Sequence, residues 1–108
     1  MKRYLGEFEE LVLLTISMLG DEAYGVAIKD ALEQKANRRI TVGSLHSTIT
    51  RLEDKGMLTA TMGEATAVRG GRKKRYFQLT GDAKQVLQQV KALRDELWSA
   101  SQLGFERS

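Results

Sequence analysis

The chain has 108 residues, of which 42% are hydrophobic, and no cysteine, which predicts one domain with a modest core and excludes disulfides and thiolate metal sites. With one histidine, no Gly-rich phosphate loop and no catalytic carboxylate pair, we expect no enzyme, no metal site and no cofactor. The formal net charge of +3 is unevenly distributed, because residues 57–80 hold five basic side chains and one acidic one. A local positive patch of this kind indicates an anionic partner.

The most apolar segment, LVLLTISMLG from Leu11, is shorter than a helix that spans a bilayer. Acidic residues precede it, and no small-residue cleavage site follows it, so we do not read it as a signal peptide. We therefore expect a cytoplasmic protein with no membrane partner.

The first two predicted elements are helices. The segment from Glu7 to Leu19 is apolar on more than one side, which predicts burial by several neighbours, and Gly20 is suited to end it. The segment AYGVAIKDALEQKA repeats large side chains every four residues and predicts a second helix, with Tyr24 in the core.

A short strand-like segment is expected at Ile40, and Thr41 can then cap a third helix, VGSLHSTITRLEDKG, that ends at Gly56. At 100° per residue this helix has a core face with leucine and isoleucine and a second face of short or planar polar donors, which suit a closely approached DNA groove. His46 lies off that polar face, where we expect a phosphate contact or a packing role. The residues of the polar face are Ser44, Ser47, Thr48 and Arg51.

The segments MLTATM and KKRYFQLT alternate in polarity and predict a β-hairpin, whose long loop contains glycines at 63, 70 and 71. Glycine lets the loop approach a surface closely, and its basic side chains could reach DNA phosphates, although a solvated charge run would look the same. Arg75 faces the same side as Phe77, so pairing with an acid at the hairpin base is the alternative for it. The basic residues expected at DNA are Arg69, Arg72, Lys73 and Lys74.

Thr80 can cap a long last helix in which apolar residues recur at alternating spacings of three and four, as in a heptad seam. So narrow a stripe on so long a helix needs another helix to pack on, either the first helix or a second copy of the chain. We expect a dimer interface formed by Val86, Val90, Leu93, Leu97 and Trp98.

The resulting order of two helices, a third helix, a hairpin and a long helix predicts an α+β, mainly helical, winged helix-turn-helix fold with a two-stranded wing and a long C-terminal dimerisation helix. The segments LVLLTISMLGDEAYGVAI, GSLHSTITRLEDKGML and RGGRKKRYFQLT resemble the PadR family of bacterial transcriptional regulators, in its short-chain branch. The resemblance covers roughly residues 8–88. It departs from the family at His46, where an aromatic residue, commonly tyrosine, is usual, and in the absence of proline.

This resemblance implies a homodimeric, sequence-specific regulator of transcription, most simply a repressor, that binds a double-stranded DNA operator. Residues 1–80 would form the DNA-binding domain, and residues 81–108 the dimerisation helix and tail. Two alternatives stay open: a ligand-responsive regulator with a pocket for a small aromatic effector at the dimer interface near Trp98, and a winged-helix protein-interaction module that does not bind DNA.

Overall fold

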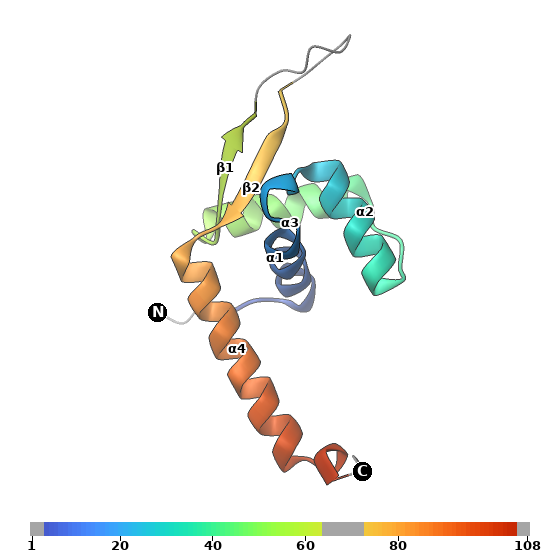
Figure 1. Cartoon of the computed structure of the whole chain (residues 1–108), viewed down its shortest axis with the longest axis vertical. Coiled ribbons are helices and arrows are strands. Elements are labelled where there is room, and N and C mark those ends of the chain that lie inside the picture. The colour runs from blue at the N-terminus through green and yellow to red at the C-terminus, as the bar shows by residue number, and fades with distance from the viewer. Residues whose placement is uncertain (1–3, 64–72, 106–108) are drawn as a thin grey trace.

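The structure is a computed structural model that describes residues 4–63 and 73–105 (Figure 1). The helices α1 to α3 and a hairpin form one body, and the last helix projects from it, which gives the molecule an elongated shape of 57 × 33 × 22 Å. This is the predicted α+β, mainly helical, winged helix-turn-helix. In chain order the elements are α1 (Glu7–Leu19), the 3-10 turn η1 (Gly20–Glu22), α2 (Gly25–Ala36), α3 (Val42–Asp54), β1 (Leu58–Met62), β2 (Arg75–Leu79), α4 (Gly81–Ala100) and the 3-10 turn η2 (Gln102–Phe105).

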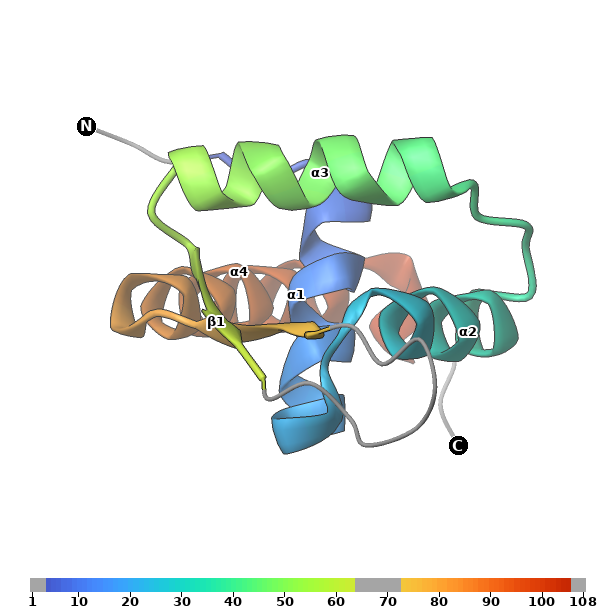
Figure 2. The same ribbon diagram turned by 90° about the horizontal axis from the view of Figure 1, so that it is seen from above.

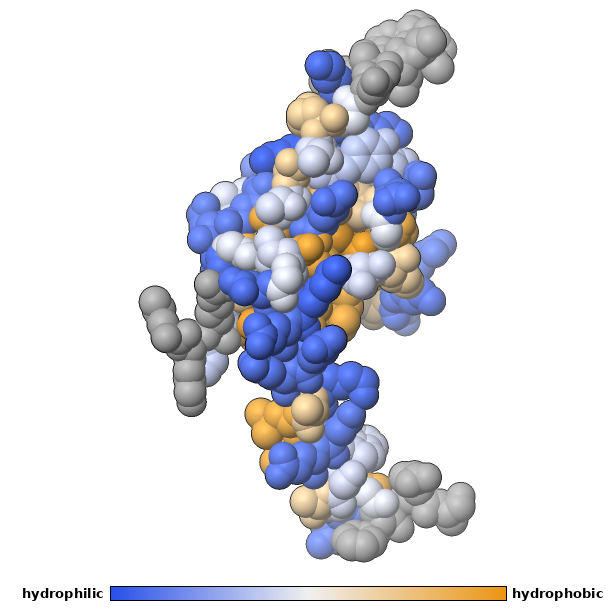
Figure 3. Space-filling view, turned by 60° about the vertical axis from the view of Figure 1, so that its left-hand side comes forward, coloured by the Kyte–Doolittle hydropathy of each residue, from blue (hydrophilic) through white to orange (hydrophobic). Residues whose placement is uncertain are grey.

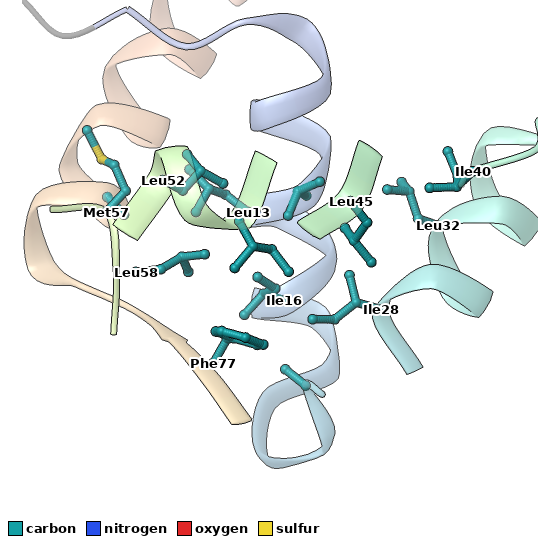
Figure 4. Packing of buried hydrophobic residues seen from close by; sticks show 14 residues of the cluster. Leu13, Ile16, Ile28, Leu32, Ile40, Leu45, Leu52, Met57, Leu58 and Phe77 are labelled. Carbon is teal, nitrogen blue, oxygen red and sulfur yellow. The ribbon is translucent and has the colours of Figure 1, made fainter. Parts of the chain in front are cut away.

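Helix α1 is the centre of the core and packs against α2, α3 and β2. Its Val12 and Leu13 are fully buried, and Ile16 is 2% exposed, so the predicted burial on several sides is confirmed. Figure 4 shows side chains from α2, α3 and both strands converging on Leu13 and Ile16. The other buried apolar residues of the cluster are Ala23, Ile28, Leu32, Ile40, Leu45, Ile49, Leu52, Met57, Leu58, Phe77 and Ala83.

The helix ends follow the local signals of the sequence. Gly20 ends α1 with a φ of 60°, and Gly56 follows α3 with a φ of 77°, both in the left-handed region that favours glycine. The Thr41 hydroxyl accepts a hydrogen bond from the Ser44 N–H at 3.0 Å, as expected for the cap of α3.

The predicted hairpin is also present. Strands β1 and β2 pair antiparallel, from Leu58 opposite Leu79 to Met62 opposite Arg75. Beyond the strands, the Gly63 N–H donates to the Lys74 carbonyl at 2.7 Å, which carries the pairing one step further toward the tip. The tip itself, with Arg69 and Arg72, lies outside the described residues.

The expected strand-like segment at Ile40 is wrong. The Ile40 N–H donates to the Glu33 carboxylate at 2.8 Å instead of to a strand, so this backbone group is satisfied within the helix-turn-helix. The same bond is the first cause that holds the pKa of Glu33 below its ordinary value. The hydrogen-bond partner of this backbone group is therefore a side chain of α2 and not another strand.

The strand-like segment lies before α2 instead, at Tyr24, which forms an isolated bridge with Tyr76 of β2. The Phe77 N–H donates to the Ala23 carbonyl at 2.9 Å. Tyr24 is consequently half-buried at the surface rather than in the core, and its ring and the Tyr76 ring form a T-shaped pair with centroids 5.6 Å apart. The helix starts two residues later than predicted because Ala23 and Tyr24 are extended toward the hairpin.

Thr80 joins three elements at the base of the hairpin. Its hydroxyl accepts a hydrogen bond from the Ala83 N–H at 3.1 Å, which caps α4 as predicted. The same hydroxyl donates to the Gly56 carbonyl at 2.7 Å, and the Thr80 N–H donates to the Met57 carbonyl at 3.0 Å. Thr80 thereby fixes the direction in which α4 leaves the body.

Replacing Thr80 by valine keeps the shape and removes both hydroxyl bonds. We expect Thr80→Val to lower the free energy of unfolding by about 1–2 kcal/mol, the usual cost of a lost cap and a lost hydrogen bond. Chemical denaturation would measure the loss. Thr59→Val, an exposed threonine of β1, is the control and should change stability by less than about 0.5 kcal/mol. Equal stabilities of the two variants would contradict this role of Thr80.

Candidate nucleic-acid interface

Helix α3 lies along one edge of the molecule, with α1 on its inner side (Figure 2). Its inner face is set by Leu45, Ile49 and Leu52, which are at most 5% exposed. The opposite face is therefore open to solvent, and most of its side chains are small or polar. The exposed residues of α3 are Val42, Gly43, Ser44, His46, Ser47, Thr50, Arg51 and Asp54.

The prediction that Thr48 belongs to the exposed polar face is wrong. Thr48 is 2% exposed, and its hydroxyl donates to the Ser44 carbonyl one turn earlier at 2.9 Å. That internal bond satisfies the hydroxyl, so the residue can lie on the core side of the helix. The true outer face is rotated away from Thr48 and includes Thr50, which sequence reasoning missed. The signal was available, because Thr50 lies roughly opposite the leucine stripe at 100° per residue.

His46 lies beside the outer face, on the flank that points to the wing. It lines a groove of about 430 Å³ between α3, the start of α2 and β2, together with Val26, Val42, Lys29 and Lys74. The histidine is exposed, so a contact to a partner on this flank is open to it. A role in core packing is excluded by that exposure.

The wing base is built from aromatic and basic side chains. Lys74 Nζ lies 4.0 Å from the centre of the Tyr24 ring, a cation–π contact that holds the ammonium near the first turn of α2. Lys73 and Lys74 are both exposed. Of the four basic residues predicted at DNA on the wing, these two are described, and Lys74 lines the groove beside His46.

Arg75 pairs with an acid at the base of the hairpin, which is the alternative that the sequence left open for it. Its guanidinium pairs with the Glu53 carboxylate of α3 at 3.0 Å and lies 5.5 Å from the centre of the Phe77 ring. Arg75 therefore ties the wing to α3 at the base of the hairpin.

The other flank of α3 carries arginines from two elements. Arg51 of α3 and two residues of the α2–α3 connection, Arg38 and Arg39, line a surface hollow of about 480 Å³ beside the start of α1. Ser44 and Ser47 lie on the same hollow. Arg51 is predicted at DNA from its place on the polar face of the helix, whereas no pattern in the sequence singles out Arg38 or Arg39.

Glu9 of α1 anchors this flank. It is 5% exposed and accepts hydrogen bonds from Lys55 Nζ at 2.8 Å, from the Gly6 N–H at 2.9 Å and from Arg51 Nε at 3.3 Å. Burial by itself would raise the pKa of Glu9, but the bonds from Lys55, Gly6 and Arg51 outweigh it and leave the pKa below its ordinary value. The carboxylate therefore stays ionised and holds the Arg51 side chain in place.

Helix α4 divides the predicted seam into two parts. Ala83 is fully buried, and Val86 and Leu87 are half-buried against the core of the same chain, so Val86 is first of all a core contact. From Val90 onward the stripe leaves the body, although Arg94 still reaches Glu10 of α1 at 3.0 Å. Leu93, Leu97 and Trp98 are 53–60% exposed, and apolar surface gathers on this projecting part of the helix (Figure 3).

Metal-ligand clusters and membrane-spanning helices are two further features to consider in the described residues. Across residues 4–63 and 73–105, no three histidine, aspartate or glutamate side chains come together as metal ligands would. Within the same ranges, no helix combines the length and the apolarity that a membrane crossing requires.

A helix-turn-helix whose second helix presents a polar face, followed by a hairpin with a basic base and a long terminal helix, defines a winged helix-turn-helix protein. The sequence matches the transcriptional regulator PadR-like family over residues 12–89, and the chain belongs to that family. The resemblance seen in the sequence is thereby confirmed. No curated protein is similar enough in sequence to count as a match.

Solved structures agree with this assignment. A PadR-like transcription factor from Bacteroides fragilis is 26% identical, with a TM-score of 0.69 over 86% of this chain and 84% of the other. A PadR family transcriptional regulator from Eggerthella lenta is 25% identical, with a TM-score of 0.66 over 94% and 88%. A PadR-like regulator from Bacillus cereus, at 19% identity, shares the fold with a TM-score of 0.70 over 94% and 93%. These relatives are named as regulators of transcription and not as enzymes.

The Glu9 cluster predicts how stability depends on pH. Because the pKa of Glu9 is depressed in the folded state, its contribution is present above the unfolded pKa and is lost as the pH falls through the folded pKa. Glu9→Gln should therefore lower the unfolding free energy by about 1–3 kcal/mol at pH 7. Below about pH 5 the difference from the parent protein should shrink.

Denaturant unfolding between pH 7 and pH 3 would test this. Exposed Glu22→Gln serves as the control and should follow the parent at every pH. A Glu9→Gln deficit that stays constant down to pH 3 would show that shape, and not charge, is what Glu9 contributes.

Proposed function

We propose that the chain acts as a homodimeric, sequence-specific, double-stranded DNA-binding regulator and that it represses transcription by covering a promoter. The observation that supports this most is the outer face of α3, which stands free of the core with basic residues on both flanks. An α-helix fits the major groove of B-DNA, where short polar side chains can reach base edges. Ser47 and Thr50 would read bases, while Lys73 and Lys74 would hold phosphates.

Membership of a family of transcriptional regulators supports the same reading. In this proposal residues 1–80 bind DNA, and residues 81–108 form the dimer. It also gives Arg69 and Arg72 of the wing tip a role at phosphates, and it leaves His46 at the edge of the DNA-facing surface. A winged-helix module that binds protein alone would not need this positive charge.

The dimer would form along α4, through Val90, Leu93, Leu97 and Trp98. Three of these large side chains are more than half exposed in the single chain, which is costly in water unless another surface covers them. A two-fold dimer would also present two α3 helices to half-sites about one DNA turn, roughly 34 Å, apart. A second copy therefore explains both the apolar stripe and the need for two reading helices.

A second candidate function is a response to a planar aromatic effector at this interface. The observation in its favour is Trp98, which is 53% exposed at the outer end of the stripe next to Leu97. Such a ligand would quench tryptophan fluorescence and lower the affinity for DNA. If Trp98→Ala leaves every effector response intact, the effector site lies elsewhere.

The DNA proposal can be tested with duplex from the upstream region of the chain's own gene. The parent protein should prefer that duplex to scrambled DNA, and transcription from a promoter that carries it should fall when the protein is present. Lys73→Gln with Lys74→Gln should weaken binding at least tenfold and reduce the slope of log affinity against log salt by roughly 3–4, since a dimer would lose four phosphate contacts.

Lys84→Gln with Lys91→Gln removes the same charge from exposed positions of α4 and is the matched control. It should bind like the parent protein. A parent protein that binds scrambled DNA equally well at every salt concentration would refute sequence-specific regulation.

The dimer can be tested with two single variants that add a negative charge to α4, one on the apolar stripe and one on the opposite side. Leu97→Glu puts a carboxylate into the apolar stripe and should give a monomer at micromolar concentrations in sedimentation equilibrium. Its affinity for DNA should fall more than tenfold, because the second half-site no longer binds as part of one molecule. Gln88→Glu adds the same charge on an exposed side away from the stripe and should stay dimeric. A dimeric Leu97→Glu would contradict the α4 interface.

A further inference from the structure

The hollow beside α3 concentrates positive charge on the flank opposite the wing. Its lining includes Arg38, Arg39 and Arg51, together with Ser44 and Ser47. The two acids of α1 that face it, Glu7 and Glu9, do not cancel this charge. Glu9 is also bonded to Lys55, and Glu7 is 71% exposed and 3.6 Å from Arg38.

The three arginines differ in how they are held. Arg38 lies over the Phe8 ring at 5.5 Å, so its planar guanidinium is fixed against the body. Arg51 is bonded through Nε to Glu9 and through Nη2 to the Thr48 hydroxyl, both at 3.3 Å, and yet its side chain is 55% exposed. Arg39 is exposed and forms no ion pair in the described part of the chain, although the charge of the Glu33 carboxylate of α2 acts on it.

Two further features favour an anion at this place. Thr41 also lines the hollow, and it caps α3, so the positive end of that helix dipole is close by. Arginine also offers several donors in a fixed plane, which match the oxygens of a phosphate better than a single ammonium does. The hollow therefore has the chemistry of a phosphate site.

The position of the hollow suggests which phosphate it would take. A helix in the major groove, which is about 12 Å wide, has a sugar–phosphate backbone on each side. The wing flank of α3, with His46 and Lys74, would face one backbone. The hollow lies on the other flank, next to Ser44 and Ser47 of the same helix.

We propose that Arg38, Arg39 and Arg51 form a second phosphate-binding site that grips the DNA strand across the groove from the wing. This rests on the proposed function, because it needs α3 in the major groove. Arg39 is the residue free to move to the phosphate, while Arg38 and Arg51 are placed in advance by Phe8 and Glu9. The site adds affinity and fixes the tilt of α3, but it reads no sequence, since phosphates carry none.

The test is the salt dependence of binding to the upstream duplex and to scrambled DNA. Arg38→Gln with Arg39→Gln should reduce the slope of log affinity against log salt by roughly 3–4 for a dimer. The affinity for both duplexes should fall by the same factor, so that the preference for the upstream duplex is unchanged. Arg39→Gln alone, which breaks no ion pair among the described residues, should give about half of the change in slope and the melting temperature of the parent protein.

Lys84→Gln with Lys91→Gln is again the control for lost charge. If the arginine variants keep the slope of this control, the phosphate site is refuted while the proposed function stands. If the parent protein itself does not bind duplex DNA, both fail. Inorganic phosphate separates a DNA contact from a site for free anions: protection of the parent protein against thermal unfolding by millimolar phosphate, absent in Arg39→Gln, with no effect of the variants on DNA binding, would also overturn the proposal.

Discussion

The packing of α3 onto α1 is the constraint on which the rest of the interface depends. Leu45, Ile49 and Leu52 must leave water, and the only way to bury all three is to turn one side of the helix toward α1. That choice fixes which polar residues face outward, and it brings Thr48 inside with its hydroxyl bonded to the preceding turn. The packing of the core therefore determines which face of α3 is exposed to a partner.

Ionic and polar contacts then set the parts around α3 at fixed positions. Glu9 joins α1 to Arg51 and Lys55, Arg75 joins the wing to Glu53, and Thr80 joins the hairpin base to α4. Each contact links segments that are at least about twenty residues apart in the chain. These contacts fix the positions of the two basic flanks of α3 relative to each other. The wing and the hollow could therefore contact the same DNA duplex at once.

Helix α4 leaves a stripe of large apolar side chains uncovered in the single chain. Its first turns are covered by the core, and its later apolar residues are open to water, with Arg94 held to Glu10 between them. A protein of this size buries a modest share of its surface, so the dimer we propose would add apolar burial that the single chain lacks. In the dimer we propose, the same contact would couple stability to the spacing of the two reading helices.

The sequence by itself determined the order of elements, the caps at Thr41 and Thr80, the turn at Gly20 and the family, because these depend on local chemistry and on a spaced motif. Only the tertiary structure decided the features that depend on contacts between residues far apart in the sequence. The sequence pattern predicts a core residue at Tyr24 and a strand-like segment at Ile40, and both predictions are wrong because periodicity does not show which backbone groups will meet. Arg38 and Arg39 follow no recognisable pattern in the sequence. The fold brings the α2–α3 connection beside Arg51, and only this places the three arginines on one hollow.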